Sequence, residues 1–140
     1  MPQPGAELTN PTLHVLLVED NPYDRRLAVA VLEAAGHHLD AVGDGMAALA
    51  AARANRYDII LMDVGLPVLN GVATMRLIRA LGGHNRIVPI LAVTARAEPG
   101  ARQALIAAGM DGYLAKPYTA AALYRALEDV TASTLAAEAA

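Results

Sequence analysis

The feature that most constrains this fold is a regular alternation of short apolar runs with segments of helical pattern. Apolar runs rich in β-branched residues are typical of strands buried on both faces of a sheet. Pro89 has no backbone donor, so we expect the paired part of the fourth run to begin there. The predicted strands cover residues 13–18, 38–42, 58–62, 87–93 and 112–115.

Helices are predicted between these runs and after the last one. Asn21 before Pro22 is a helix-start signal, and Gly36 is expected to end the same helix. Pro99 lies at the start of a later helix, and Thr119 is expected to cap the last one. The helical segments cover residues 22–35, 46–54, 71–81, 98–108 and from 119 past 127.

Strands that alternate with helices imply parallel βαβ units, and right-handed crossovers place helices on both faces of the sheet. The predicted fold class is therefore α/β: a flavodoxin-like, doubly wound, five-stranded parallel sheet of order 2-1-3-4-5 with five helices. The pattern has no internal repeat and indicates one domain over residues 13–130. Residues 1–12 are expected to form a disordered leader or linker, and residues 131–140 a helix extension or a linker.

Composition excludes several classes of protein. The 140 residues include no Cys, which excludes disulfide scaffolds, thiolate metal sites and cysteine nucleophiles. The net charge of -3 gives no basic footprint, so we expect no nucleic-acid contact by this domain. No apolar stretch approaches the roughly 20 residues that span a bilayer, and no secretory signal is present. We therefore expect a cytoplasmic domain without membrane contact.

Polar side chains stand where four of the five predicted strands end. The carboxyl ends of parallel strands share one edge of the sheet, and ligands bind at that edge in such folds. We therefore expect these side chains to converge on one cleft. They are Glu19 and Asp20 after the first strand, Asp63 after the third, Thr94 after the fourth, and Lys116, the only lysine of the chain, after the fifth.

Three carboxylates, a hydroxyl and an ammonium in one cleft suit a divalent cation and a phosphoryl group. Mg²⁺ favours oxygen ligands and uses few protein carboxylates, while a lysine provides a point charge for phosphate. A carboxylate can also attack phosphorus to form an acyl phosphate. The alternative is that acids at strand ends only cap helices. Helix capping explains the position of any one of the acids, but it does not explain why Lys116 lies between an apolar strand and Pro117.

Four segments of the chain, together with the polar residues they contain, resemble the receiver domain of two-component response regulators. The resemblance extends from about residue 13 to residue 130 and is greatest to receivers of hybrid histidine kinases. The segments that carry it are residues 17–22, 60–67, 93–95 and 112–117.

The resemblance implies a role for each polar residue of the predicted cleft. Asp63 corresponds to the phosphoacceptor, which takes a phosphoryl group from phosphohistidine. Asp20 and Asp63, with the backbone carbonyl of Gly65, correspond to ligands of Mg²⁺ (or Mn²⁺), and Glu19 to the residue that holds a metal-bound water. Lys116 corresponds to the residue that pairs with a phosphoryl oxygen and is followed by a cis proline.

The resemblance also implies a conformational switch made by Thr94 and Tyr113. Thr94 would bond a second phosphoryl oxygen, and Tyr113 would turn inward into the space that Thr94 vacates. These movements would shift the balance between two conformations of a nearby surface, through which a phosphorylation-dependent homodimer could also form. Gly65 and Arg96 occupy positions whose side chains tune acyl-phosphate lifetime, so we expect an altered lifetime. The switch surface would comprise the helix at 98–108, the strand at 112–115 and the helix from 119.

The function implied is a phosphorylation-dependent signalling switch, either the receiver of a hybrid histidine kinase or a single-domain response regulator. Its expected partner is a histidine kinase or a histidine phosphotransfer protein. It would not be an enzyme, beyond promoting its own phosphotransfer and autodephosphorylation. The alternative is a degenerate receiver that acts as a phosphorylation-independent protein-interaction module.

Two other classes of protein fit the residues poorly. A phosphatase of the haloacid dehalogenase type would need a second Asp where Gly65 stands. In a flavodoxin-like FMN carrier, Glu19 and Asp20 would repel the phosphate.

Side chains outside the cleft are given mainly structural interpretations. Arg25 and Arg26 are expected on an exposed helix face, with docking to a phosphotransfer helix as the alternative. Tyr118 is expected to pack near the rim of the cleft, with a role in partner binding as the alternative. The histidines lack the spacing of metal ligands and are expected to be structural or solvated; they are His14, His37, His38 and His84.

Overall fold

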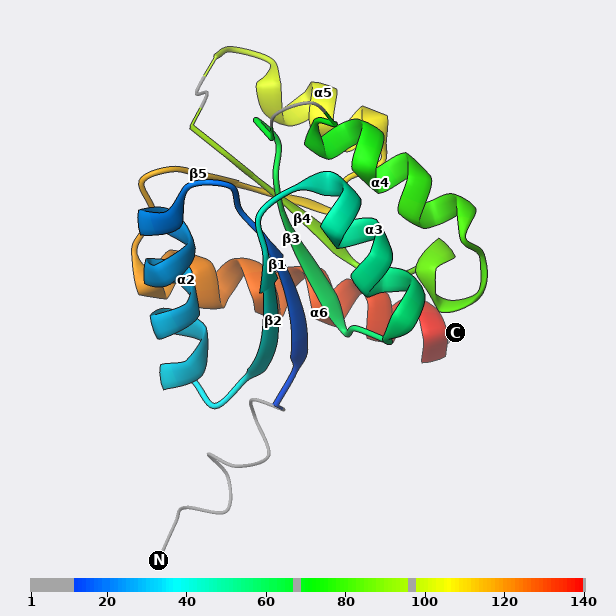
Figure 1. The fold of residues 1–140 in the computed structure, drawn as a ribbon, viewed down its shortest axis with the longest axis horizontal. Helices are drawn as coiled ribbons and strands as arrows, with labels where there is room; N and C mark the ends of the chain where they lie inside the picture. The colour runs from blue at the N-terminus through cyan, green and yellow to red at the C-terminus, as the bar shows by residue number, and fades with distance from the viewer. Residues whose placement is uncertain (1–11, 67–68, 96–97, 140) are drawn as a thin grey trace, which may run out of the picture.

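A five-stranded parallel sheet forms the centre of the molecule in a computed structural model of the chain (Figure 1). The structure describes residues 12–66, 69–95 and 98–139, with side chains described as far as residue 132. Every neighbouring pair of strands is parallel, and the order is β2-β1-β3-β4-β5, as predicted. The strands are β1 (His14–Val18), β2 (His38–Val42), β3 (Ile59–Asp63), β4 (Ile90–Thr94) and β5 (Gly112–Ala115).

Five α-helices connect and follow the strands in the described residues, and polar side chains cap several of their first turns. Asn21 Oδ1 accepts hydrogen bonds from the first turn of α2, and Thr119 Oγ1 accepts one from the first turn of α6. Both caps confirm the sequence prediction. The helices are α2 (Pro22–Ala34), α3 (Gly45–Ala54), α4 (Gly71–Ala80), α5 (Ala101–Ala108) and α6 (Ala120–Ala139), and a short 3₁₀ helix, η1, covers Gly83–Arg86.

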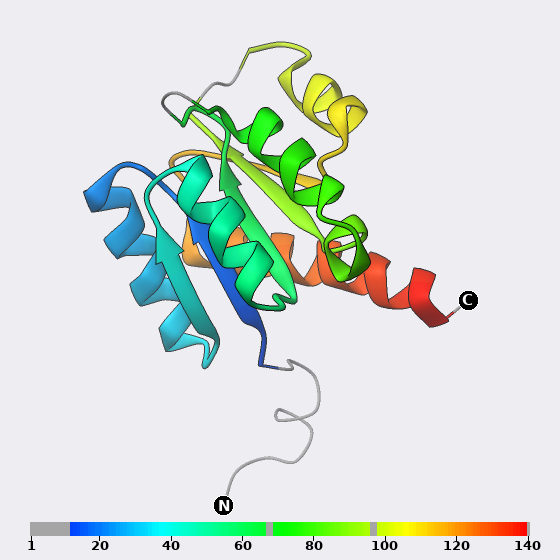
Figure 2. The ribbon, with the colours of Figure 1, turned by 45° about the vertical axis from the view of Figure 1, so that its right-hand side comes forward.

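The helices bury both faces of the sheet, because side chains alternate across each strand. On β3, Ile60 and Met62 belong to the core under α3, α4 and α5, whereas Ile59 and Leu61 belong to the core under α2 and α6. Figure 2 shows the same two layers of helices from a second direction. Both cores are dense in fully buried aliphatic side chains, so the central strands form a rigid base for the residues at their carboxyl ends.

Most boundaries lie within one residue of the predicted ranges, but two elements begin three residues later. The fourth strand begins at Ile90, and the Pro89 carbonyl accepts a hydrogen bond from the Ile60 amide of β3, so pairing starts at Pro89 as expected. The earlier part of the predicted range is not strand, because the amides of Ile87 and Val88 donate to the carbonyl of His84 and continue the turn of η1. The helix expected from residue 98 begins at Ala101, after a turn in which Gly100 adopts φ +84°. Neither shift moves a residue of the predicted cleft away from its strand end.

None of the helices in the described ranges combines the length and the hydropathy that crossing a bilayer requires. Pro67, in one of the segments that carry the family resemblance, lies outside the described residues. Arg96, which we expect to influence acyl-phosphate lifetime, and the leader at residues 1–11 lie outside them as well.

Candidate functional site

The sheet brings the predicted polar residues to one edge, at the carboxyl ends of the strands. Asp63 and Thr94 are the last residues of β3 and β4. The Glu19 amide donates to the Val42 carbonyl at the end of β2, and the Lys116 amide donates to the Thr94 carbonyl. Backbone hydrogen bonds between neighbouring strands therefore fix the starting point of each side chain.

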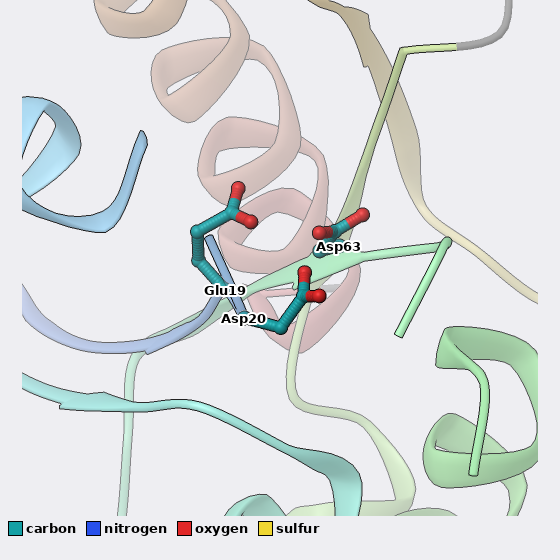
Figure 3. Close-up of side chains that lie close together, drawn as sticks. All are labelled: Glu19, Asp20 and Asp63. Carbon is teal, nitrogen blue, oxygen red and sulfur yellow. The ribbon is translucent and has the colours of Figure 1, made fainter. Parts of the chain in front are cut away.

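Three carboxylates gather at this edge, as Figure 3 shows. Glu19, Asp20 and Asp63 each offer an oxygen atom, and these atoms all lie within 4.8 Å of one another. Glu19 and Asp63 are buried, whereas Asp20 is exposed. The cluster thus has one side in the protein and one side open to water, which suits an ion that keeps part of its hydration shell.

Lys116 brings a positive charge to these acids. Its Nζ lies 2.5 Å from Glu19 Oε1, 3.1 Å from Asp24 Oδ2 and 3.7 Å from Asp63 Oδ2. The peptide bond between Lys116 and Pro117 is cis, as the family resemblance implied. Because the lysine side chain is 16% exposed, its interactions with the acids are only partly screened by water.

The loop after β3 approaches Asp63 closely. The amide of Gly65 donates a 2.9 Å hydrogen bond to Asp63 Oδ1, which orients the carboxylate. A Cβ added at Gly71, the first residue of α4, would lie only 2.6 Å from the Asp63 carbonyl oxygen. These contacts and the strand ends enclose a cleft of about 630 Å³, whose lining includes Glu19, Asp20, Asp24, Asp63, Gly65, Thr94 and Lys116.

The pKa values in the cleft follow from burial and from the short contacts between charges. Burial and a side-chain hydrogen bond to Asp63 raise the pKa of Glu19 well above its usual range. Burial acts to raise the pKa of Asp63 too, but hydrogen bonds from Glu19 and the Gly65 amide outweigh it, and the pKa is lowered. Burial opposes the charge on Lys116, yet hydrogen bonds to Glu19 and Asp24 raise its pKa. Asp63 therefore stays anionic and Lys116 cationic at neutral pH.

The two residues of the predicted switch lie on adjacent strands. Thr94 is buried at the end of β4, and Tyr113 on β5 is half-buried and packs against the core under α3, α4 and α5. Thr94 pairs with Ala115 in the sheet, and Ala92 pairs with Tyr113. The two side chains thus lie on one pair of adjacent strands, and Lys116 directly follows the second of these strands.

Two residues at the site were missed by sequence reasoning. Asp24, in the first turn of α2, contacts Lys116, and Arg25 donates a 2.8 Å hydrogen bond from its guanidinium to the Glu19 carbonyl. Both arginines were expected on an exposed helix face, but only Arg26 is exposed, because Arg25 is half-buried. The available signal was position: a helix that starts directly after Glu19–Asp20 places its first turn at the same edge of the sheet.

Three of the four histidines have local partners. His14 lies 3.4 Å from Asp40, His37 Nδ1 accepts from the Leu13 amide, and His84 Nε2 lies 2.6 Å from the Tyr57 carbonyl. His38 is exposed. Tyr118 is half-buried and packs against the core under α2 and α6, which agrees with a position near the rim.

The donor set fits a hard divalent cation. Glu19, Asp20 and Asp63 offer only oxygen atoms, and in the described residues no histidine joins this cluster. Three acids near one ammonium also leave an excess of negative charge, which a cation would neutralise. The residues present are therefore compatible with Mg²⁺.

Sequence comparisons find the same domain in known proteins. The model of the response regulator receiver domain matches residues 15–128. The sensor histidine kinase AruS of Pseudomonas aeruginosa is 43% identical over 131 residues, which are 93% of this chain and 13% of that protein. The signal transduction histidine-protein kinase BarA of Escherichia coli is 36% identical over 114 residues, 81% of this chain and 12% of that protein. The chain therefore spans only a small part of these kinases.

Solved structures agree with this fold. The receiver domain of sensor histidine kinase PA1611 from Pseudomonas aeruginosa is 43% identical, with a TM-score of 0.79 over 87% of this chain and 99% of that one. That structure has a magnesium ion coordinated in its active-site cleft. The chemotaxis response regulator CheY4 of Vibrio cholerae is 32% identical, with the same TM-score over 86% and 99% of the two chains. This chain belongs to the response regulator receiver domain family of two-component signalling systems.

Proposed function

We propose that this domain accepts a phosphoryl group from a phosphohistidine onto Asp63 and acts as a phosphorylation-dependent signalling switch. The observation that carries the proposal is the convergence of Asp63 with one ammonium and two further acids. Asp63 Oδ2 lies 3.7 Å from Lys116 Nζ, and its carboxylate shares a cluster with those of Glu19 and Asp20. An anionic nucleophile, a positive charge and a cation site in one cleft are what phosphoryl transfer to a carboxylate requires.

In the proposed reaction, a carboxylate oxygen of Asp63 forms a bond to phosphorus as the phosphorus–nitrogen bond of the phosphohistidine breaks. The histidine ring leaves with the electron pair of that bond. Lys116 neutralises charge on a phosphoryl oxygen, and the Thr94 hydroxyl donates a hydrogen bond to another. The amide of Gly65 fixes the orientation of Asp63 through its 2.9 Å hydrogen bond, so the attack begins from a held carboxylate.

Glu19, Asp20, Asp63 and the backbone carbonyl of Gly65 would hold Mg²⁺, with Glu19 acting through a bound water. When bound, Mg²⁺ supplies positive charge that stabilises the developing charge on the phosphoryl oxygens. The magnesium ion in the related PA1611 receiver domain supports this assignment.

The signal would leave the site through Thr94 and Tyr113. A phosphoryl group on Asp63 would draw Thr94 toward it, and Tyr113 would move into the space that Thr94 leaves. This change biases the surface formed by α5, β5 and α6, which would bind a downstream partner or a second copy of the chain.

The proposed phosphodonor is a cytoplasmic histidine kinase or histidine phosphotransfer protein. The similarity to AruS and BarA supports a place in a hybrid histidine kinase, and the similarity to CheY4 supports a single-domain response regulator. In either setting the domain would work as a phosphoacceptor that promotes its own phosphorylation and dephosphorylation.

The experiment is incubation of the chain with Mg²⁺ and acetyl phosphate, followed by intact-mass measurement. We expect one phosphoryl adduct on the wild type, none on Asp63→Asn, and none when EDTA removes the metal. Glu33→Gln, at an exposed position near the end of α2, is the matched control and should form the adduct as the wild type does.

An adduct that persists in Asp63→Asn would overturn the assignment of the phosphoacceptor. No adduct on the wild type with either acetyl phosphate or beryllofluoride would instead indicate a degenerate receiver that binds partners without phosphorylation.

A further inference from the structure

Lys116 is held by two carboxylates that are closer to it than the nucleophile. Its Nζ lies 2.5 Å from Glu19 Oε1 and 3.1 Å from Asp24 Oδ2, but 3.7 Å from Asp63 Oδ2. The Asp24 contact is a hydrogen bond as well as an ion pair. An ammonium has three donors, so both of these acids occupy donors that a phosphoryl group on Asp63 would need.

Asp24 has a fixed position beside the cleft. Its backbone amide donates to Asn21 Oδ1, the cap of α2, and its side chain lies in the first turn of the helix. The N-terminal end of a helix interacts favourably with negative charge, so this position suits a carboxylate. Its side chain is 36% exposed, so solvent can replace Lys116 as its partner when Lys116 moves away.

The two acids that hold Lys116 differ in their relation to the cation site. Glu19 belongs to the cluster whose oxygen atoms lie within 4.8 Å of one another, together with Asp20 and Asp63. Asp24 is not a member of that cluster, although it lines the same cleft. It therefore adds negative charge to the cleft and occupies Lys116 without offering a ligand to the metal.

We propose that Asp24 is a positioning residue that competes with the phosphoryl group for Lys116 and thereby lowers the affinity of the cleft for phosphoryl groups. This inference rests on the proposed phosphorylation of Asp63. Release of the Asp24–Lys116 pair is then part of activation, and the carboxylate at position 24 sets how readily the domain takes up phosphate.

The test compares wild type with Asp24→Asn in a beryllofluoride titration at saturating Mg²⁺ and low ionic strength. Removing a half-exposed competing charge should tighten beryllofluoride binding about three- to fivefold and speed phosphorylation by acetyl phosphate by a similar factor. The difference should shrink at high salt, because the competing carboxylate is partly screened.

Two further variants separate competition from a structural effect. Asp24→Glu keeps a carboxylate at this position, and its affinity for beryllofluoride should stay close to that of the wild type. Glu33→Gln removes the same charge from the same helix, at an exposed position away from the cleft, and should leave the affinity unchanged.

Lys116 itself provides a direct readout, because it is the only lysine of the chain. Isotope-labelled lysine gives one side-chain ammonium signal in the NMR spectrum. We expect Asp24→Asn to shift this signal in the free protein, and beryllofluoride to bring the wild-type and variant signals to nearly the same position, because Lys116 then has the same new partner in both.

Equal or weaker beryllofluoride binding by Asp24→Asn, with an adduct that still depends on Asp63, would overturn the role of Asp24 alone. The same conclusion would follow if Asp24→Glu failed to keep wild-type affinity, or if the lysine signal were the same in wild type and Asp24→Asn. Failure of the wild type itself to bind beryllofluoride would overturn the proposed function.

Discussion

Lys116 illustrates how much one side chain depends on its neighbours. A buried ammonium costs free energy unless acids compensate for it, and here Glu19, Asp24 and Asp63 all lie within 3.7 Å of Nζ. Lys116 can therefore gain a new partner only at the expense of its contact with one of these acids. The same ion pairs that stabilise the lysine in the resting cleft limit its availability to a ligand.

His37 is a second residue whose surroundings determine its charge. Its Nδ1 accepts a 3.0 Å hydrogen bond from the Leu13 amide, just before β1, so the folded state needs the neutral ring. Burial lowers the pKa of His37 from its usual value of 6.5. The unfolded chain therefore binds a proton more readily than the folded one, and protonation favours unfolding.

We expect His37 to make the protein less stable as the pH falls below about 6.5. One proton can contribute a slope of at most about 1.4 kcal/mol per pH unit. Urea denaturation of wild type and His37→Gln between about pH 7 and pH 5 measures this, and the variant should lose less stability. The exposed His38→Gln is the control; an equal change of slope in both variants would contradict the role of His37.

Among the elements, the junction of β3 with α4 determines where the nucleophile lies. Gly71 begins α4 directly over the strand end: an added Cβ would lie 2.6 Å from the Asp63 carbonyl oxygen and 2.9 Å from Val64 Cα. Backbone atoms cannot move aside as the end of a flexible side chain can. The close approach of α4 to Asp63 therefore requires glycine at this position.

We predict that Gly71→Ala lowers the free energy of unfolding by about 1–3 kcal/mol, the range for overpacked positions. Gly65→Ala is the matched control in the same junction, because the nearest atom to its added Cβ is Asp63 Oδ1 at an ordinary 3.7 Å. It should change stability by less than about 1 kcal/mol. Denaturation in urea without Mg²⁺ measures both, and equal losses would contradict the packing argument.

Elements with strong local signals could be predicted from the sequence, and those decided by competing contacts could not. The cap of α2 at Asn21 and the order of strands followed from local pattern and from crossover handedness. The turn that precedes β4 did not, because the apolar Ile87 and Val88 fit a strand equally well. Their amides instead donate to the His84 carbonyl in the turn of η1.

At the scale of the whole molecule, the sheet holds an excess of negative charge at one edge. Residues from Glu19 to Lys116, nearly 100 positions apart, meet there because all five strands are parallel. Repulsion among Glu19, Asp20 and Asp63 opposes folding, and the densely packed cores on both faces of the sheet compensate for it. A cation in the cleft should therefore stabilise the entire domain.

We expect Mg²⁺ to raise the melting temperature by about 5 °C at a concentration tenfold above its dissociation constant, which corresponds to about 1.4 kcal/mol. Asp20→Asn should be more stable than wild type without metal, since one repelling charge is gone, and should lose most of the response. Differential scanning calorimetry with Mg²⁺ and with matched NaCl measures this. An equal rise with both salts would show only general screening.

By itself, the sequence determined the fold class and five of the residues that line the cleft. Alternating strand and helix patterns admit few topologies, and a parallel sheet brings its carboxyl ends to one edge whatever the details of packing. The positions of Glu19, Asp20, Asp63, Thr94 and Lys116 at the cleft followed from that rule alone.

Only the tertiary structure decided which partners these residues have. The contact of Lys116 with Asp24 joins the residue after β5 to the first turn of α2, across 92 positions of sequence, and Arg25 turns inward to the Glu19 carbonyl. Distances of this kind depend on how α2 packs on the sheet and on where each side chain can reach. Local pattern predicts which edge of the sheet a residue occupies, but the balance between competing ion pairs is set by the whole packed fold.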